Sequence, residues 1–368
     1  MPENAAKVTN HFGETETIRK KALYLFTAPS YNLNNMRLLT LSALSIAAVL
    51  LWSCGGEDRL PESHGRAYEL MVVCPENEWN AALGDTLREI LMEPFPMLNQ
   101  REPWFDVVYI RPSGYKNLLL RGRNLLEVKI DSKYKEAAMT ARYDVRAAPQ
   151  LIVSLTGPGD SAVTAYVSEN RKALRQIYDM AERDWFKAVS ARYNEKKLGE
   201  TIQNKFGFRI NIPKGYTQKY DGDDMMWLSY ELPLGSVNLL IYTNPYSGKD
   251  DFTLDSLRSR RNRFAARIPG PSRGSYLTTS PVFDPEVQYV QINGRSWAEM
   301  RGFWDVEGDF MGGPFVSYST MVDGRVITID GFVFNPKLDG RLGKRNYIRQ
   351  IENIMYSVEF VGQPDQAE

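Results

Sequence analysis

The chain contains very little histidine and very little cysteine. Its 368 residues include two histidines, His11 and His64, and two cysteines, Cys54 and Cys74. Both histidines precede Arg66, where we expect the folded body to begin. A body without imidazole supplies neither a Ser-His-Asp triad nor a Cys-His pair, and no His-ligated zinc or iron site. We therefore expect a protein without a metal or other cofactor, and we do not expect an enzyme.

Structural disulfides are not expected either. Cys54 is assigned below to a lipid, which leaves Cys74 without a partner. Because Cys74 follows the apolar strand predicted at Tyr68–Val73, we interpret it as a small buried hydrophobic residue.

Net charge is absent as well. The 45 Lys and Arg residues balance the 45 Asp and Glu residues, so the formal net charge is zero. General nucleic-acid-binding proteins carry a broad positive field, which this composition lacks. We therefore expect no nucleic-acid partner. The length and a hydrophobic content of 43% are sufficient for two folded domains with cores of their own.

The apolar run Leu38–Leu51 is too short to cross a bilayer, which takes about 20 helical residues. It follows the positive charge of Arg37, and this arrangement is typical of a secretory signal peptide. The run ends in Leu-Trp-Ser-Cys, which resembles a lipobox, where the cysteine is acylated before cleavage. Trp52 is bulkier than the residue usually found there. We predict a signal peptide over residues 36–53 and lipid attachment at Cys54.

Two alternatives concern this N-terminal region. The apolar run could be a buried helix that ends in an ordinary cysteine, but the Gly-Gly pair and the polar tether over residues 54–65 favour the signal peptide. Residues 1–35 are either an artefact of start-codon choice, since Met36 offers a conventional start, or an extended n-region with charges at Arg19–Lys21.

The hydrophobic periodicity of the mature chain predicts an α+β fold with two α/β subdomains joined by a long charged helix. The N-terminal subdomain is expected at residues 66–158, the linking helix at 159–198, the C-terminal subdomain at 199–360 and a tail at 361–368. Strands and helices alternate in the first subdomain. The second is richer in strands, which predicts a mainly antiparallel sheet covered by helices.

The predicted strands are apolar segments bounded by turn signals such as Asn293-Gly294. They lie at Tyr68–Val73, Trp104–Ile110, Asn124–Ile130, Gln150–Leu155, Phe206–Ile212, Met226–Leu232, Val237–Thr243, Val287–Ile292, Ser296–Trp304, Phe315–Met321 and Arg325–Phe334. Besides the linking helix, helices are predicted at Glu78–Met92, Thr253–Arg267 and Arg345–Ser357.

Three short motifs match known sites only weakly. Ser113 and Lys116 have the S-x-x-K spacing of penicillin-interacting enzymes, but S-D-N and K-T-G are missing downstream. Asp221–Asp224 lacks the further ligands of an EF-hand loop, and Gly340–Lys344 lacks the spacing of a phosphate-binding loop. We interpret these motifs as a loop, a turn before a strand and a basic linker before the last helix.

Five arginines crowd the helix predicted at Thr253–Arg267. They could bind phosphorylated headgroups, lipopolysaccharide or an acidic partner. Charge runs on amphipathic helices are usually solvated, and we favour that interpretation. The five are Arg258, Arg260, Arg261, Arg263 and Arg267.

The segment 301–315 combines aromatic residues, carboxylates and glycines. One interpretation is a binding edge, where aromatic side chains and carboxylates hold a sugar or a peptide and glycines permit close approach. The other, which we favour, is a β-hairpin with Phe303, Phe310 and Phe315 packed inward. Trp304 points opposite to Phe303 on a strand, so we expect it on the surface. The candidate binding residues are Arg301, Trp304, Asp305, Glu307, Asp309, Phe310, Gly312 and Gly313.

Several stretches of the mature chain carry a family resemblance. They are Ala148–Gln150, Phe206–Pro213, Arg301–Trp304, Phe310–Phe315, Gly331–Pro336 and Lys344–Arg345. With them the chain resembles an uncharacterised lipoprotein family of the Bacteroidetes, the domain-of-unknown-function family 4837, over nearly all of its mature length. The resemblance implies an envelope lipoprotein and no particular activity. The second half, with a strand ending in Ile-Pro-Lys-Gly and a C-terminal helix, is similar to the PsbP/Mog1 sandwich.

These observations predict a membrane-anchored lipoprotein of the cell envelope, at the outer membrane, on its periplasmic face or at the cell surface. Its expected role is that of a non-catalytic binding or assembly module for a protein or glycan partner. The alternative is an envelope hydrolase that uses carboxylates or the Ser113–Lys116 pair. The sequence leaves the oligomeric state open.

Overall fold

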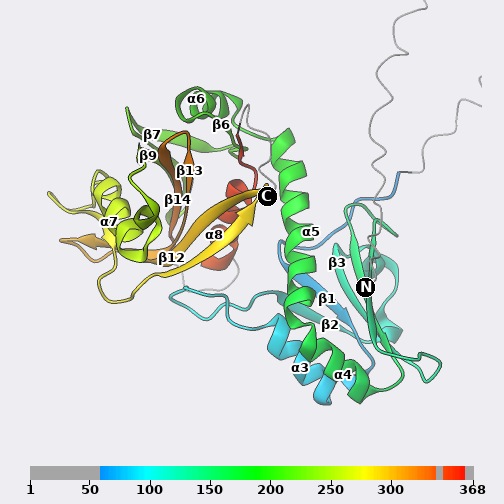
Figure 1. Cartoon of the computed structure of the whole chain (residues 1–368). Helices are drawn as coiled ribbons and strands as arrows, with labels where there is room; N and C mark the ends of the chain where they lie inside the picture. Colours follow the sequence, from blue (N-terminus) through cyan, green and yellow to red (C-terminus); the bar gives the residue numbers. More distant parts are fainter. Residues whose placement is uncertain (1–58, 337–342, 361–368) are drawn as a thin grey trace, which may run out of the picture. The chain divides into compact units, whose positions relative to one another are not determined.

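Two large β-sheets organise the described part of the chain, one in each half (Figure 1). The computed structural model describes residues 59–336 and 343–360. Residues from Leu60 onward group into one compact unit. One sheet is mixed and the other is antiparallel, and helices pack on both. The predicted α+β class is therefore confirmed.

Part of the predicted organisation lies outside the described residues. This applies to residues 1–35, the signal peptide at 36–53, the lipid attachment site Cys54 and the tail at 361–368. Among the helices that the structure describes, none combines the length and the apolar character needed to span a bilayer.

The N-terminal sheet has five strands in the order β2-β1-β3-β5-β4. Neighbouring strands are parallel, except that β4 runs antiparallel to β5 at one edge. The central strands are nearly continuous apolar runs, as expected for parallel strands that are buried on both faces. Their bounds are β1 (Glu69–Val73), β2 (Asp106–Ile110), β3 (Asn124–Ile130), β4 (Ala138–Tyr143) and β5 (Leu151–Gly157).

Helices cover one face of this sheet. Apolar side chains such as Leu87, Val163 and Tyr178 pack against Leu126 and its neighbours on the strands. Cys74 is fully buried, as predicted for a small hydrophobic residue. The helices are α2 (Glu76–Trp79), α3 (Ala82–Leu91), α4 (Asp160–Glu169) and α5 (Arg171–Arg192).

The opposite face of the N-terminal sheet has a much smaller apolar cluster. It contains Leu125 and Ile152, and the partly buried residues packed against it are Tyr115 and Leu119. These two belong to the connection between β2 and β3, which contains the short 3₁₀ helices η2 (Pro112–Gly114) and η3 (Asn117–Arg121). A loop therefore lies over this face where the other face has helices.

The predicted linking helix at 159–198 is three helices. Asn170 separates α4 from α5, and its side-chain amide donates a hydrogen bond to the Tyr166 carbonyl, an alternative to continued helix. A second break, at Tyr193–Glu195, precedes α6 (Lys196–Phe206). The 22 residues of α5 span roughly 33 Å at 1.5 Å per residue. This helix contributes buried side chains to the N-terminal core, so it is part of that core as well as a connection.

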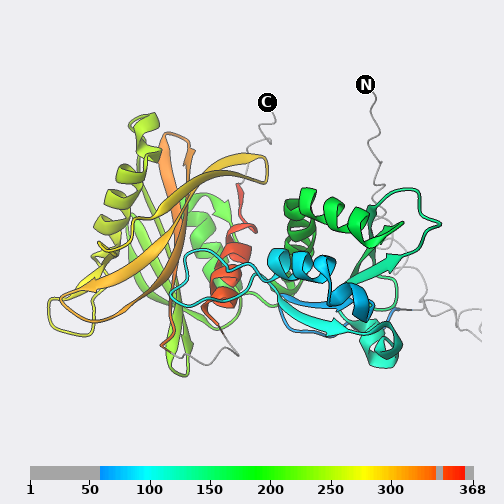
Figure 2. The ribbon, with the colours of Figure 1, turned by 90° about the horizontal axis from the view of Figure 1, so that it is seen from below.

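The C-terminal sheet is antiparallel, with the strand order β10-β12-β13-β14-β9-β8-β7 and β11 paired with β12. Helix α7 lies against one face, and helices α6 and α8 lie against the other (Figure 2). The strands are β7 (Tyr216–Gly222), β8 (Met225–Leu232), β9 (Gly235–Pro245), β10 (Tyr276–Thr279), β11 (Glu286–Ile292), β12 (Arg295–Glu307), β13 (Gly312–Val322) and β14 (Arg325–Phe334). The two further helices are α7 (Leu254–Ala265) and α8 (Lys344–Met355).

One predicted strand is wrong, and some strands were not predicted. At Phe206–Ile212 the helix α6 runs to Phe206 and ends on Gly207, whose φ of +84° gives a left-handed cap. Only Phe208–Arg209 then forms a strand, β6, paired with β15 (Glu359–Phe360). Strands β4 and β7 lie at sheet edges and are mostly exposed and polar, so they lack the apolar signal that marks a buried strand.

The folded body begins earlier than Arg66. Residues Glu62 and His64 form bridges with Ala148 and Gly122 at the amino ends of the parallel strands. The ring nitrogen Nε2 of His64 also lies 2.6 Å from the Leu118 carbonyl oxygen. The expectation that the body contains no imidazole is therefore wrong.

Helices α5 and α8 are joined by a buried ion pair. Arg349 of α8 is 2% exposed, and its Nη2 lies 3.1 Å from Oδ1 of Asp179 on α5. The guanidinium also stacks over the Tyr68 ring, with 3.9 Å between its central carbon and the ring centroid. Trp104 donates a further hydrogen bond from Nε1 to the same carboxylate. This cluster connects the core of the first half to that of the second.

Candidate functional site

The predicted binding edge at residues 301–315 is a β-hairpin. Strands β12 and β13 pair in register, with Asp305 opposite Gly312, and the turn contains Gly308 at a φ of +81°. Phe315 is buried and Phe303 is half-buried. The backbone is thus the expected hairpin, but Phe310, expected to pack inward, is fully exposed.

The prediction that Trp304 lies on the surface is wrong. Its side chain is 1% exposed, and its Nε1 donates a hydrogen bond of 3.2 Å to the Val333 carbonyl. The ring packs edge-on against Phe332, with centroids 5.3 Å apart. Gly313 makes room for this ring, because a Cβ there would lie 2.9 Å from the indole nitrogen and 2.3 Å from the Val333 oxygen. The tryptophan belongs to the core that α7 covers.

Arg301 is also part of the interior. Its side chain is 14% exposed and forms ion pairs with Glu299 on its own strand and Glu352 on α8. The second pair joins Nη2 and Oε1 at 2.5 Å. We therefore assign Arg301 to the attachment of α8 to the sheet, and its guanidinium is not available as a surface contact.

The remaining predicted binding residues lie at the end of the hairpin. Glu307 and Phe310 are exposed, and Asp305 and Gly312 are half-buried. Asp309 accepts a hydrogen bond of 2.5 Å from the Ser272 hydroxyl. Because Arg301, Trp304 and Gly313 lie inside, the structure does not bring the eight predicted residues together into one surface.

The five arginines of the α7 region are mostly held in ion pairs, so the fully solvated face that we favoured is not observed. Arg261 is buried, with Nε 2.8 Å from Oδ2 of the buried Asp330. Arg263 remains exposed. The other pairs are Arg258 with Asp255 and Asp284, Arg260 with Asp251, and Arg267 with Asp224.

A hollow of about 510 Å³ lies between α7 and the end of β9. Two acidic and two basic side chains contribute to its lining, so its formal charge is balanced. Arg260 is engaged there by Asp251, with Nη2 2.9 Å from Oδ1. The lining residues are Asn244, Pro245, Ser247, Asp251, Asp255, Ser256, Ser259, Arg260 and Arg263.

The short motifs have structural roles or none. Ser113 and Lys116 are both exposed, and no hydrogen bond joins them in the part of the chain that the structure describes. Of Asp221–Asp224, the first two residues end β7, and Asp223 and Asp224 form the predicted turn before β8. Residues 59–336 and 343–360 hold no group of three or more His, Cys, Asp or Glu side chains placed to bind a metal ion. Of the motif Gly340–Lys344, residues 340–342 lie outside the described residues.

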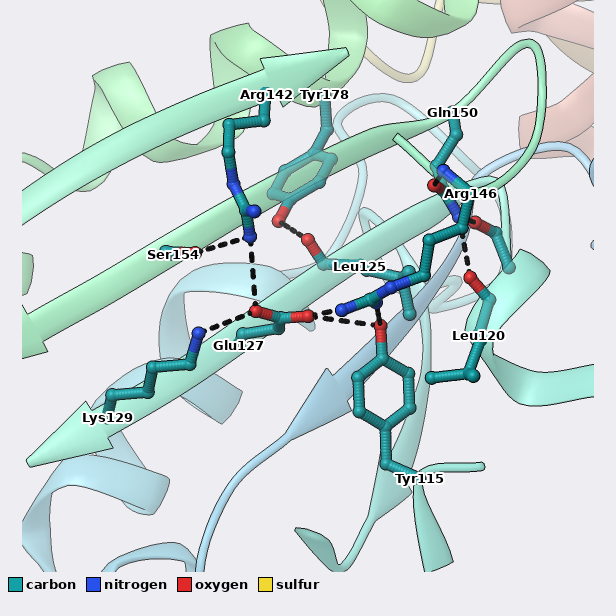
Figure 3. Close-up of polar contacts among 11 residues, drawn as sticks. Tyr115, Leu120, Leu125, Glu127, Lys129, Arg142, Arg146, Gln150, Ser154 and Tyr178 are labelled. Carbon is teal, nitrogen blue, oxygen red and sulfur yellow. Dashed lines mark hydrogen bonds and ion pairs between the residues drawn. The ribbon is translucent and has the colours of Figure 1, made fainter. Parts of the chain in front are cut away.

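A polar cluster surrounds Glu127 on the loop-covered face of the N-terminal sheet (Figure 3). The Glu127 side chain is 4% exposed, and both of its oxygens are engaged. Oε2 lies 3.0 Å from Lys129 Nζ and 3.4 Å from Arg142 Nη2. Oε1 accepts hydrogen bonds of 3.1 Å from the Tyr115 hydroxyl and 3.3 Å from Arg146 Nη1.

This cluster has more positive than negative charge. Three cations surround one carboxylate, and their side chains are 51%, 43% and 34% exposed for Lys129, Arg142 and Arg146. Burial raises the pKa of Glu127, but the hydrogen bond and charge of Lys129 and the contacts with Tyr115 and Arg146 outweigh it, so the pKa is lowered. Burial and the neighbouring Glu127 raise the pKa of Tyr115 to about 12. Glu127 is therefore ionised and Tyr115 is protonated at neutral pH.

Gln150 fixes the loops that carry the cluster. Its side-chain amide donates to the carbonyls of Leu120 and Gly122, at 2.9 and 2.8 Å. Its Oε1 accepts from the Arg146 backbone N–H at 2.9 Å. One buried amide thus holds both the segment over the sheet face and the segment that supplies Arg146.

None of the sites predicted from the sequence includes this cluster, although two features of the sequence indicate it. Glu127 is a single carboxylate inside the apolar strand β3, and a buried charge requires partners. The segment Arg111–Arg146 contains nine Lys or Arg and four Asp or Glu, a net charge of +5 in a chain whose total is zero. Neutrality of the whole chain therefore conceals a basic segment.

Comparisons with known families divide the chain near the break between α5 and α6. Residues 63–191 match the model of a domain of unknown function (DUF8532), and residues 195–357 match that of another (DUF4837). The chain carries two domains of unknown function. The resemblance to family 4837 was thus expected over too long a stretch, because Ala148–Gln150 falls in the first domain. No curated protein matches the chain.

Solved structures give only weak similarities. The solution structure of cyanobacterial PsbP (CyanoP) from Synechocystis sp. PCC 6803 is 16% identical and covers 42% of this chain and 86% of its own, with a TM-score of 0.26. A crystal structure from Bacteroides thetaiotaomicron is 12% identical, covers 44% and 47%, and has a TM-score of 0.25. A mutant of the protein Mog1 is 10% identical, covers 42% and 91%, and has a TM-score of 0.27.

Replacing Trp304 with Ala should strongly destabilise the protein. Loss of a large buried ring typically costs about 3–5 kcal/mol in the free energy of unfolding. The matched control is Phe310→Ala in the same hairpin, where the side chain is fully exposed and a change within about 0.5 kcal/mol is expected. Urea denaturation of the wild type and the two variants measures both changes in the free energy of unfolding. Equal stability of the two variants would contradict the burial of Trp304.

Replacing Glu127 with Gln should change how stability depends on pH. The pKa of Glu127 is lower in the folded than in the unfolded protein, so its contribution is complete above the unfolded value of about 4.3 and is lost as the pH falls through the folded value. The wild type should therefore lose more stability than the variant between neutral pH and the acid range. At neutral pH the variant should be less stable by about 1–3 kcal/mol.

Denaturation with urea at a series of pH values measures this difference. The control is Glu136→Gln, an exposed carboxylate of the same basic segment, which should keep the wild-type pH dependence. If Glu127→Gln follows the wild-type curve at every pH, the cations do not stabilise the ionised carboxylate.

Proposed function

We propose that this protein is a lipid-anchored, non-catalytic binding protein of the bacterial cell envelope. Its ligand carries acidic groups, on a protein or a glycan, and binds at the basic face of the N-terminal sheet. The anchor is a lipid on Cys54, and its location is the outer membrane of a member of the Bacteroidetes. The anchor rests on the sequence of the export signal, and the ligand chemistry rests on the cluster around Glu127.

The observation that carries the binding proposal is the excess of cations around Glu127. Its carboxylate compensates one of three positive charges and holds Lys129, Arg142 and Arg146 in place. About a third to a half of each of these side chains remains exposed. Guanidinium groups recognise carboxylates and phosphates through paired hydrogen bonds. An arrangement that is already ordered loses less side-chain entropy when a ligand binds.

The same cluster is a poor candidate for acid–base catalysis. A general acid or base works best when its pKa lies near the working pH. The pKa of Glu127 is lowered, and that of Tyr115 is raised to about 12, so both are far from neutrality. Both Glu127 oxygens already accept hydrogen bonds from the protein. These features favour a positioning role for the carboxylate.

Replacing Cys54 with Ala should remove the lipid anchor. The thiol is the acylation site in this proposal, so the variant should not incorporate labelled fatty acid and should leave the membrane fraction. The control is Cys74→Ser, whose thiol is buried inside the N-terminal core. Fatty-acid labelling in the native host, followed by fractionation, measures the effect. Undiminished labelling of Cys54→Ala would show that the anchor is wrong.

Removing two exposed cations of the cluster should weaken ligand capture. In Lys129→Ala/Arg142→Ala, cross-linking in native cells should recover about tenfold less of the acidic partner, since each lost charge contact is worth about 1 kcal/mol or more. The matched control, Lys196→Ala/Lys197→Ala, removes two exposed cations from α6. Thermal melts verify that both variants fold. If the folded variant and the control recover equal amounts of the acidic partner, the ligand does not bind at the basic face.

A further inference from the structure

The first described residues of the chain are attached to the basic loop that covers the N-terminal sheet. The Ser63 N–H donates to the Ala148 carbonyl at 3.3 Å, and the His64 N–H donates to the Arg121 carbonyl at 3.0 Å. The Arg123 N–H in turn donates to the His64 carbonyl at 2.8 Å. Residues 63 and 64 therefore lie beside this loop.

The loop presents cations and one apolar side chain to solvent. Tyr115 and Leu119 point inward and pack on the sheet, whereas Leu118 is 64% exposed between the exposed Lys116 and Arg121. The cations of the Glu127 cluster lie on the same face of the sheet. A large exposed leucine flanked by basic residues is the composition of surfaces that bind the interface of an anionic membrane.

The length of the tether limits how far this loop can be from the membrane. Pro61, whose carbonyl accepts a hydrogen bond from the Ala148 N–H, lies seven positions after Cys54. A fully extended chain of that length spans at most about 25 Å. Thermal motion on such a short tether repeatedly brings the loop to within about 8 Å of the membrane surface. This distance is the Debye length, within which the charges of the loop and of the lipids interact.

We propose that Lys116, Leu118 and Arg121 rest on the anionic surface of the membrane that holds the lipid anchor. This inference rests on the lipid anchor of the proposed function and adds to it a second contact, between the loop that covers the sheet and lipid headgroups. The two cations bind phosphate groups, and Leu118 enters the interfacial layer. The segment 111–146 has a net charge of +5 and the rest of the chain one of −5, so the field of an anionic leaflet turns this segment toward it.

The test measures contact between Leu118 and the membrane. The full lipidated chain carrying Leu118→Cys is labelled with an environment-sensitive fluorophore. The label goes to this position because Cys74 is fully buried and Cys54 carries the lipid. The chain is reconstituted into vesicles of phosphatidylcholine alone or mixed with phosphatidylglycerol, each containing a quencher attached to lipid headgroups. A second chain labelled through Ser259→Cys, on the exposed side of α7, is the positional control.

Quenching at Leu118→Cys should be strong in anionic vesicles and weak in neutral ones, and Ser259→Cys should show no such difference. Adding Lys116→Glu and Arg121→Glu should lower the membrane-contacting population by about tenfold or more. Lys196→Glu and Lys197→Glu, the same charge change on α6, should leave it unchanged. Salt near 1 M, where the Debye length is about 3 Å, should abolish the effect of lipid charge.

The outcomes separate this inference from the proposed function. If the chain does not float with either kind of vesicle, the lipid anchor is wrong, and both proposals fail. If it floats but quenching at Leu118→Cys is equal in neutral and anionic vesicles, only the membrane contact is wrong. If soluble polyglutamate shifts the label while anionic vesicles do not, the face binds a soluble acidic partner, and the inference is overturned.

Discussion

The buried ion pair between Arg349 and Asp179 joins the helices that close the two cores. A guanidinium that is 2% exposed needs a compensating charge, because burying an unpaired ion costs several kcal/mol. Asp179 supplies that charge from α5, which closes the N-terminal core, while Arg349 stands on α8, which closes the C-terminal core. The rings of Tyr68 and Trp104 contact the same guanidinium. The chain thus matches two family models, one in each half, and a charged contact joins a helix of one half to a helix of the other.

The cluster around Glu127 uses buried charge in a different way. Asp179 neutralises Arg349, whereas Glu127 compensates only part of the positive charge that surrounds it. The remainder lies on a face that a loop covers and that the first described residues adjoin. The chain is neutral overall, so this basic face implies an excess of acidic residues elsewhere. For a protein held close to an anionic surface, such a separation of charge sets an orientation as well as a binding strength.

The sequence indicates the strands of both cores more accurately than it indicates the candidate site. The periodicity of Asn124–Ile130 and Arg325–Phe334 predicted β3 and β14 to the residue, because buried strands carry an apolar signal. For the hairpin at 301–315, alternation shows that Phe303 and Trp304 face opposite ways but does not show which faces are covered. Helices cover both faces of that sheet, so the tryptophan is buried and the predicted binding edge loses its main residue. The exposed aromatic side chain is Phe310, in the turn, where strand alternation no longer applies.

The sequence by itself determined the α+β class, the buried state of Cys74 and the position of most core strands, because these follow from the local spacing of apolar residues. It also contained the net charge of +5 in the segment 111–146, although the neutral total conceals it. Only the tertiary structure decided which charges cancel. Four of the five arginines near α7 meet aspartates that lie between 3 and 69 positions away along the chain, whereas Lys129, Arg142 and Arg146 share one glutamate. Ion pairing depends on the distance in space between two charged side chains. For residues far apart along the chain, that distance is set only when the strands and helices pack together.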